Sequence, residues 1–245
     1  QPLKTLPDVQ AFRSSPDRKS VLVLSPPASI RTLALWQGES KPLVTIAADG
    51  YVTGAVWSPD SKWIAFTSNR TSPTNFELFR YDIASRSTTL LMNLVGYNEV
   101  KDISPDMKSI AILHADSRRQ GELHVWQNGR ITKRWHNEVD AFESDAAFTA
   151  DSKSMFFTMI GAPGTSQLMI GVLASEATKP LETQNGPVQR LRLSEDRLRL
   201  AITVNNKGVS EIRGWEIDES GRLHRSVKLP KAGGVVADAP AVLKG

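Results

Sequence analysis

The segment from His136 to Asp145 carries the densest set of side chains in this sequence that could do chemistry. It holds one imidazole, on His136, and four carboxylates, on Glu138, Asp140, Glu143 and Asp145. Oxygen and nitrogen donors of these kinds bind divalent cations, and carboxylates also attract cationic peptides. The spacing matches neither an EF-hand calcium loop nor a zinc-protease motif. We therefore interpret the segment as a solvated acidic loop, with a metal or cationic-peptide site as the alternative.

The rest of the sequence contains no recognisable catalytic motif. Cysteine is absent, which excludes disulfides, thiolate zinc sites and a cysteine nucleophile. There is no Gly-x-Ser-x-Gly elbow, and the loop at 161–164 lacks the lysine of a phosphate-binding loop. Paired carboxylates could serve a glycosidase, but no glycosidase motif is present. We expect no catalytic, metal-binding or cofactor-binding residue and no cofactor, although His136 could titrate near neutral pH.

The charge distribution argues against a nucleic-acid partner. The formal net charge is +4 and the sequence pI is about 9.4, but the basic residues are dispersed. The densest basic groups are Arg118-Arg119 and the alternating set Arg190, Arg192, Arg197 and Arg199, which fits a solvated strand face. No window has the length and apolar character of a membrane span, and no signal peptide is visible after Gln1.

The elements that must position any site follow from a repeated tripeptide. Ser-Pro-Asp begins at Ser15, Ser58 and Ser104, and degenerate copies begin at Thr149 and Ser194. The successive spacings are 43, 46, 45 and 45 residues. A fixed period in this range indicates a repeat architecture, which defines a scaffold much better than it defines a ligand.

The second copy shows the repeat unit most clearly. Pro presets the backbone of the turn, while Ser and Asp can bond nearby amides. Runs of apolar or alternating residues on either side predict four strands, at 54–57, 63–67, 76–83 and 88–94. Four antiparallel strands per repeat of this length are typical of a β-propeller blade, so we expect an all-β propeller. The aromatic residues expected in its core are Trp57, Trp63, Phe66, Phe148, Phe156 and Phe157.

The segment Val-Trp-Ser-Pro-Asp-Ser-Lys-Trp-Ile-Ala-Phe at 56–66 resembles the TolB-like, WD-like propeller repeat. The resemblance covers essentially the whole chain, and it weakens in the fourth and fifth copies. The turn lysine of the family matches Lys19, Lys62, Lys108 and Lys153. The family's turn glycine is replaced by Arg18, Ser61, Met107 and Ser152, with no clear counterpart in the fifth copy. The resemblance implies a structural family in a bacterial envelope setting, periplasmic or extracytoplasmic, and it implies no catalytic motif.

The repeat spacing predicts one propeller domain over 1–245. Its expected blades are 9–50, 51–95, 96–138, 139–184 and 185–230, with 231–245 as a tail or closing strand. We expect five blades. A ring with an incomplete sixth blade and a fragment of a longer propeller are the alternatives. A strand within 235–243 could pair with the N-terminus and close the ring.

Binding groups in a propeller normally lie on loops, because packing occupies the strands. The connections between blades and the loops between second and third strands share one face, opposite the Ser-Pro-Asp turns. The candidate partner-binding residues on this face are Tyr51, Arg70, Tyr97, Glu99, Arg118, Arg119, His136, Glu138 and Asp140.

Three hypotheses for function follow from this arrangement. The first is a non-catalytic module that binds a protein or peptide partner. The second is the extracytoplasmic sensory domain of a membrane-anchored regulator or receptor, which itself contains no membrane span. The third is the propeller of a prolyl-oligopeptidase-type hydrolase, or a five-bladed glycosidase. The sequence does not indicate an oligomeric state.

Overall fold

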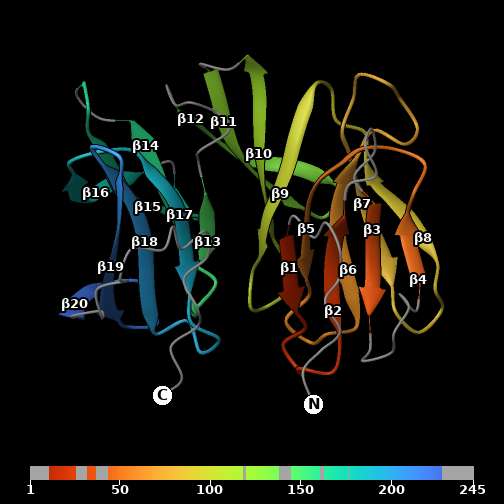
Figure 1. Ribbon diagram of the computed structural model, residues 1–245, viewed down its shortest axis with the longest axis horizontal. Helices are drawn as coiled ribbons and strands as arrows, with labels where there is room; N and C mark the ends of the chain where they lie inside the picture. Colours follow the sequence, from red (N-terminus) through yellow and green to blue (C-terminus); the bar gives the residue numbers. More distant parts are fainter. Residues whose placement is uncertain are drawn as a thin grey trace. The chain divides into compact units, whose positions relative to one another are not determined.

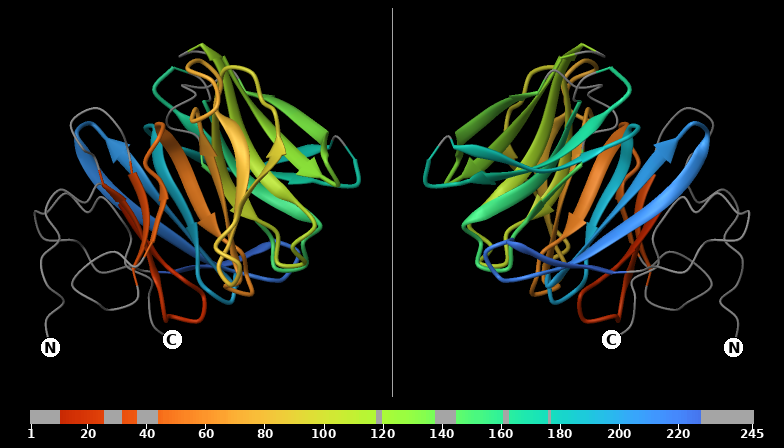
Figure 2. Two further views of the ribbon diagram at one scale, coloured as in Figure 1. Left: turned by 90° about the vertical axis from the view of Figure 1, so that its right-hand side faces the viewer. Right: turned by 90° about the vertical axis from the view of Figure 1, so that its left-hand side faces the viewer.

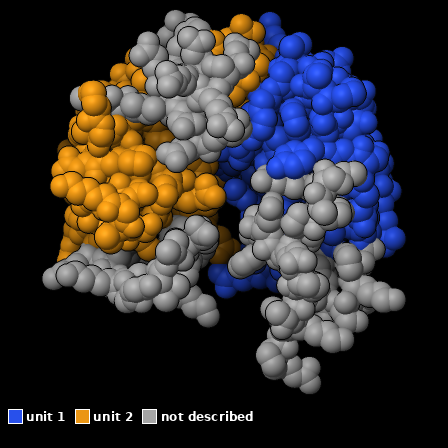
Figure 3. Space-filling view, turned by 45° about the horizontal axis from the view of Figure 1, so that its top comes forward, with its two compact units in different colours: residues 1–103, 128–130 blue, residues 104–127, 131–245 orange. Residues whose placement is uncertain are grey.

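A computed structural model describes residues 11–25, 32–36, 44–117, 120–137, 145–160, 163–175 and 177–227. These residues contain twenty β-strands and no helix. The chain divides into two compact units, one of residues 1–103 with 128–130 and one of residues 104–127 with 131–245 (Figure 3).

The described strands form five sheets of four strands (Figure 1). The first two sheets contain β1 Ala11–Ser14, β2 Val21–Ser25, β3 Thr32–Trp36 and β4 Val44–Ala47, then β5 Val52–Trp57, β6 Trp63–Ser68, β7 Glu77–Asp82 and β8 Thr88–Met92. The third contains β9 Tyr97–Ile103, β10 Ile110–Ser117, β11 Gln120–Gln127 and β12 Arg130–Asn137. The last two contain β13 Ala146–Phe148, β14 Ser154–Ile160, β15 Ser166–Val172 and β16 Thr178–Gln184, then β17 Val188–Leu193, β18 Arg199–Asn206, β19 Val209–Ile217 and β20 Leu223–Val227.

Within every sheet, each strand lies beside the strands that precede and follow it in the chain. This antiparallel meander confirms the predicted all-β fold of four-stranded propeller blades. The sheets are strongly twisted (Figure 2). The possible closing strand within 235–243 lies outside the described residues, as does any contribution of 1–10.

The Ser-Pro-Asp turn joins the first and second strands through a recurring set of hydrogen bonds. In the second sheet, Ser58 N donates to Trp63 O at 2.9 Å, and Trp63 N donates to Ser58 Oγ at 3.0 Å. Asp60 Oδ1 accepts from Ser58 Oγ at 2.7 Å and from Lys62 N at 3.1 Å. The same pattern recurs in the turns that begin at Ser15, Ser104, Thr149 and Ser194. The degenerate copies therefore keep the turn's geometry, because they keep its hydroxyl and its carboxylate.

The residue after the turn aspartate adopts a left-handed conformation in every copy. Its φ is 60° at Arg18, 60° at Ser61, 59° at Met107, 60° at Ser152 and 58° at Arg197. Arg197 is thus the counterpart that the sequence left unassigned in the fifth copy. It was missed because Leu198 stands where the other copies have lysine. Residues with a Cβ are strained in this region, which explains why glycine suits the position.

Three of these left-handed residues link neighbouring repeats. In the first unit, Ser61 Oγ accepts a hydrogen bond from Asp17 N at 3.0 Å. In the second unit, Ser152 Oγ accepts one from Asp106 N at 3.1 Å, and Arg197 Nη1 donates to Phe148 O at 2.7 Å. Glycine could make none of these contacts, so the side chains offset backbone strain with bonds between blades.

Met107→Gly and Ser152→Gly should separate the strain from the bond. Met107 is 41% exposed, so its replacement should relieve strain and stabilise the chain by about 0.5–1 kcal/mol. Ser152→Gly relieves the same strain but removes the bond from Asp106 N, worth about 1 kcal/mol, and should be neutral or destabilising. Urea unfolding of both variants checks this. Equal shifts in their midpoints would show that the Ser152 bond contributes nothing.

The predicted core aromatic residues are all buried. In the first unit, Phe66 stacks on Phe79 with ring centroids 5.3 Å apart, inside an apolar cluster drawn from the first two sheets. Trp57 completes its hydrogen bonding there by donating from Nε1 to Arg13 O at 3.0 Å. In the second unit, Phe148, Phe156 and Phe157 are 0–2% exposed and belong to two further clusters. These aromatic side chains are therefore occupied by packing in the core and are not available to bind a partner.

Candidate functional site

In the first unit, three loop segments meet at one end of the second sheet. Val52 pairs with Ser68 and Ser68 pairs with Glu77, so residues 48–51 and 69–76 emerge at the same end. Residues 93–96 join them, because Phe76 N donates to Gly96 O at 2.9 Å. We call the surface of these segments, with Tyr97, the loop face. The Ser-Pro-Asp turn lies at the opposite end of the strands, as predicted.

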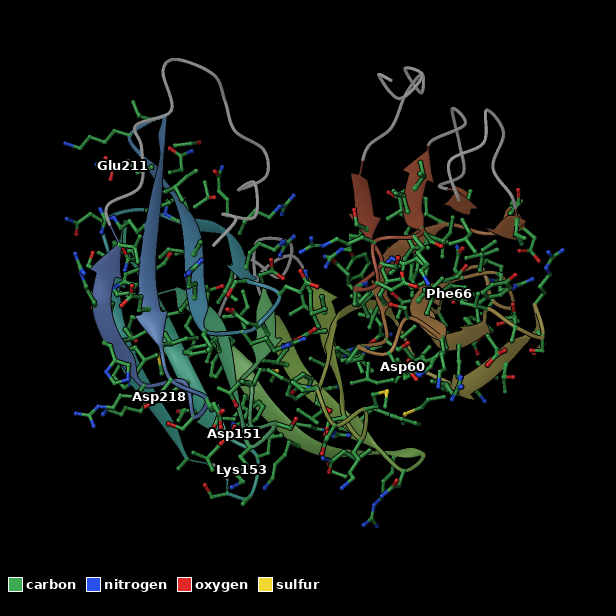
Figure 4. The ribbon with its side chains drawn as sticks, turned by 90° about the horizontal axis from the view of Figure 1, so that it is seen from below. Asp60, Phe66, Asp151, Lys153, Glu211 and Asp218 are labelled. Atoms are coloured by element: carbon green, nitrogen blue, oxygen red, sulfur yellow. The ribbon has the colours of Figure 1, made fainter. Side chains whose placement is uncertain are left out.

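At the end of each sheet opposite the loop connections lie the Ser-Pro-Asp-type turn between the first and second strands and the turn between the third and fourth strands. In the second unit, Glu211 and Asp218 mark the two ends of β19, and Asp151 and Lys153 lie at the end where Asp218 stands (Figure 4). A backbone bond from Asp151 N to Glu219 O at 3.0 Å connects the turns there. Hydrogen bonds from Ser220 and from the Arg222 amide lower the pKa of Asp218 to about 2. The carboxylates of Asp151 and Asp218 accept hydrogen bonds from residues of their own turns, which argues for a structural role.

An aromatic cluster occupies the loop face. Phe76 contacts Tyr51 edge to face, with ring centroids 6.1 Å apart, and contacts Tyr97 at 5.4 Å. All three side chains are half-buried. The structure thus brings together two predicted residues, Tyr51 and Tyr97, and adds Phe76. Phe76 was missed because its apolar side chain reads as the start of the following strand.

Val95 precedes Gly96, whose carbonyl accepts the bond from Phe76 N, and its side chain is 77% exposed. Its loop is fixed by amide side chains: Asn98 Nδ2 donates to Val95 O and Gly96 O at 3.1 and 3.2 Å. Asn75 Oδ1 accepts from Gly96 N at 3.1 Å. An exposed apolar side chain on a rigid loop is favourable for binding, because little conformational entropy remains to be lost.

The two predicted charged residues in this unit are both held in ion pairs. Arg70 Nη2 lies 2.8 Å from Asp49 Oδ2, and the Arg70 guanidinium lies over the Phe79 ring, with 5.7 Å between Cζ and the centroid. Glu99 Oε1 lies 2.9 Å from Nζ of Lys101, which is only 8% exposed. Tyr97 Oη also donates to Glu99 Oε2 at 3.3 Å. These pairs flank the aromatic cluster with fixed charges of both signs.

The loop face rests on close packing between β5 and β9. A Cβ at Gly54 would lie 2.8 Å from Glu99 Cγ and 2.8 Å from Val100 O, so only glycine fits. Thr67 Oγ1 accepts from Val100 N at 3.2 Å, and Thr53 Oγ1 lies 2.7 Å from Thr67 Oγ1. This close contact between β5 and β9 fixes the relative positions of the loop-face segments that adjoin these strands.

The remaining predicted site residues are not brought into this cluster. Arg118, Arg119, Glu138 and Asp140 lie outside the described residues, as does the side chain of His136. The end of the acidic segment is described, and it corrects the interpretation as a solvated loop for one residue. The Asp145 side chain is 7% exposed, pairs with Arg192, and accepts a bond from Leu191 N at 3.3 Å.

Asp145 was expected in a solvated loop because its neighbours in the sequence are charged, but it directly precedes β13 and contacts Leu191 and Arg192 of β17 instead. Arg192 and Arg197 were expected on a solvated strand face. Both are bound within the protein, to Asp145 and to Phe148 O respectively. The basic set in this region is therefore partly used for packing between blades, which weakens it further as a nucleic-acid surface.

The second unit contains a buried histidine. His124 is 6% exposed, stacks on His114 with ring centroids 5.0 Å apart, and its Nε2 lies 2.7 Å from Glu122 Oε2. Burial lowers the pKa of His124 although the Glu122 hydrogen bond opposes the shift. The imidazole is consequently favoured in its neutral form in the folded chain.

His124 should make the protein sensitive to mild acid. Because its pKa is lower when folded, the unfolded chain binds a proton first as pH falls below the ordinary histidine value, and stability is lost. The stability present above about pH 7 should therefore decline toward pH 5. His124→Gln should decline less over this window in urea unfolding. An unchanged pH dependence in the variant would contradict this assignment.

No metal centre or membrane-spanning helix is found in the part of the chain that the structure describes. It holds no group of three or more histidine, aspartate or glutamate side chains arranged to bind a metal ion. Nor does it contain a helix long and apolar enough to cross a membrane.

Comparison with known proteins gives matches at the level of structure only. No family model and no curated protein sequence matches the chain. TolB from Acinetobacter baumannii matches with a TM-score of 0.61 and 20% identity, over 86% of this chain and 50% of TolB. The chain thus spans half the length of that protein.

Two further solved structures show the range of similar proteins. The β-propeller domain of Cps50 (Swd1) from Myceliophteria thermophila gives a TM-score of 0.63 at 12% identity, covering 97% of this chain and 71% of that one. A prolyl endopeptidase gives 0.62 at 17% identity, covering 91% and 35%. The predicted resemblance is confirmed: the chain has a β-propeller fold of the TolB-like and WD-like kind.

Proposed function

We propose that this chain is a non-catalytic β-propeller module that binds a protein or peptide partner through its loop face. The observation that carries the proposal is Val95, 77% exposed on a loop fixed by Asn75 and Asn98, beside the aromatic cluster. Rigid aromatic and apolar groups at a surface are typical anchors of protein interfaces. The flanking charges, paired as Arg70–Asp49 and Glu99–Lys101, would supply the polar rim.

We further propose that the five sheets belong to one propeller domain and that the protein works in the bacterial envelope. The repeat period and the TolB-like resemblance support both points. Binding in the envelope would suit a scaffold that presents fixed loops to a neighbouring protein.

Two substitutions test the loop face. Val95→Asp and Tyr97→Ala should each reduce recovery of a specific co-purifying protein by about tenfold or more, since both remove an anchor. Arg86→Asp, in the exposed turn at the other end of the second sheet, is the matched control. Quantitative mass spectrometry of cross-linked envelope extract provides the measurement. A set of captured proteins unchanged by both loop-face variants would contradict the proposal.

The prolyl endopeptidase match favours one alternative. In that case the chain would be the propeller of a hydrolase, and it would gate access to a separate catalytic domain. An α/β-hydrolase sequence in the same gene product would support this alternative, and peptidase activity lost on separating the two parts would establish it.

A further inference from the structure

β8 is the last strand of the second sheet, and its outer edge is open (Figure 1). Thr88, Thr89 and Leu90 are exposed, Leu90 to 44%. Among the described residues, only β7 pairs with β8. An open edge presents backbone N–H and C=O groups to which another strand can pair, and proteins usually protect such edges with charged residues, with proline or by keeping them short.

The last strands of the other four sheets are protected. Three of them carry charged residues or proline: Arg130, Lys133 and Arg134 in β12, Lys179, Pro180 and Glu182 in β16, and Arg225 in β20. The fourth, β4, is uncharged, but it has only four residues and two of them, Ile46 and Ala47, are buried. In contrast, the sequence contains no charged residue from 87 to 98. β8 therefore lacks the protection that the other last strands have.

The register of β7 and β8 shows which backbone groups face outward. Asp82 N donates to Ser87 O at 3.0 Å, and these two residues are directly opposite each other in that register. Because hydrogen-bonded and non-hydrogen-bonded pairs alternate in an antiparallel ladder, Thr89 bonds to β7, whereas the N–H and C=O groups of Thr88 and Leu90 point away from it. A bulge follows Leu90, so the regular part of this edge is 88–90, with Thr89 at its centre.

We propose that β8 pairs with β8 of a second copy of this chain, in antiparallel orientation, about a two-fold axis at Thr89. In this register Thr88 lies opposite Leu90 of the second copy. Each copy offers two outward donors and two outward acceptors, and all of them are satisfied by hydrogen bonds between the copies. Charge favours the same occupant, because two uncharged edges place no like charges opposite each other, whereas two β12 edges would bring their basic residues together.

The contact between the copies is small. Three regular residues on each copy form a much smaller interface than that of a stable complex, which buries at least about 1,200 Å². The copies should therefore pair only at high local concentration. Because the two strands run antiparallel, the loop faces of the two copies point in opposite directions, so a dimer could bridge two partner molecules. Pairing itself requires no partner, so it is independent of the proposed function.

Charged residues at position 89 test the two-fold axis, where Thr89 would face Thr89 of the second copy. Thr89→Lys and Thr89→Glu should each weaken self-association by about fivefold or more, because like charges then lie directly opposite each other. An equimolar mixture of the two variants should restore it. Thr183→Lys, at an exposed threonine of β16, is the matched control and should have no effect. Sedimentation velocity between about 10 µM and about 1 mM provides the measurement.

Two results of this experiment would overturn the inference. One is a wild-type chain that stays monomeric over the whole range, which would leave the β8 edge to a strand of another protein. The other is self-association that neither charged variant weakens, which would place the contact elsewhere on the chain.

A disulfide gives a second test that does not depend on charged variants. The chain has no cysteine, and the Cα atoms of the two residues at position 89 would lie about 4.5 Å apart, within the range that a disulfide spans. Under mild oxidation, Thr89→Cys should give at least about tenfold more disulfide-linked dimer than Thr183→Cys, with an unchanged melting temperature. Equal yields from the two variants would show that random collision forms the product, and the proposed pairing would be wrong.

Discussion

Replacing Gly221 by alanine is expected to destabilise the protein by about 3 kcal/mol, combining left-handed strain with overpacking. Gly221 has a φ of +87°, and a Cβ there would lie 2.6 Å from Thr149 Cγ2 and 2.8 Å from Phe156 Cζ. The turn after β19 therefore sits directly on the neighbouring sheet of the second unit. Chemical denaturation, with the free energy of unfolding extrapolated to water, provides the measurement.

Gly208 is the matched control for this substitution. Its φ is also +87°, but nothing lies within 4 Å of the position its Cβ would take. Gly208→Ala should therefore cost only the backbone term, about 1 kcal/mol. The difference between the two variants reports the packing of one turn on the next blade. Similar losses in both would show that this packing contributes little.

Asp145→Ala is expected to cost about 3 kcal/mol, because it leaves the buried Leu191 amide without its acceptor and the partly buried Arg192 guanidinium without its counter-charge. The carboxylate joins β13 to β17 through Arg192 and Leu191 N, and Asp145 Oδ1 also accepts from Ala146 N at 3.2 Å. Its side chain is 7% exposed, so water cannot replace these bonds easily. The free energy of unfolding in urea checks the value.

Asp49→Ala provides the comparison for an exposed pair. Asp49 also pairs with an arginine, at 2.8 Å from Arg70, but its side chain is 58% exposed. Its removal should change stability by at most about 1 kcal/mol, the usual worth of a surface ion pair. If Asp145→Ala and Asp49→Ala lower the free energy of unfolding by similar amounts, the bonds of Asp145 to Arg192 and Leu191 contribute little to stability.

The scaffold could be predicted because its signals are local. The turn needs a hydroxyl, a carboxylate and a left-handed residue at fixed positions, and these can be read even where Pro or Lys is lost. Arg197 was overlooked only because its neighbour Leu198 breaks the pattern, although the backbone conformation is the same.

The candidate site could be predicted only in part, because its members come from separate loops. Tyr51 and Tyr97 were identified because the repeat places them on the face that carries the connections between blades. Phe76 and Val95 were not, since apolar residues at strand ends look like core. The role of Asp145 depends on a partner that lies 47 residues away in the chain, and no local pattern indicates it.

We propose above all that the partner docks on the loop face of the first unit. A photo-reactive amino acid placed at Val95 tests it most directly, with the same residue at Arg86 as the control at the opposite end of the second sheet. We predict that irradiation in intact cells gives a discrete cross-linked product from position 95 and none from position 86. Products from position 86 alone, or from neither position in cells that contain the native partner, would contradict the claim.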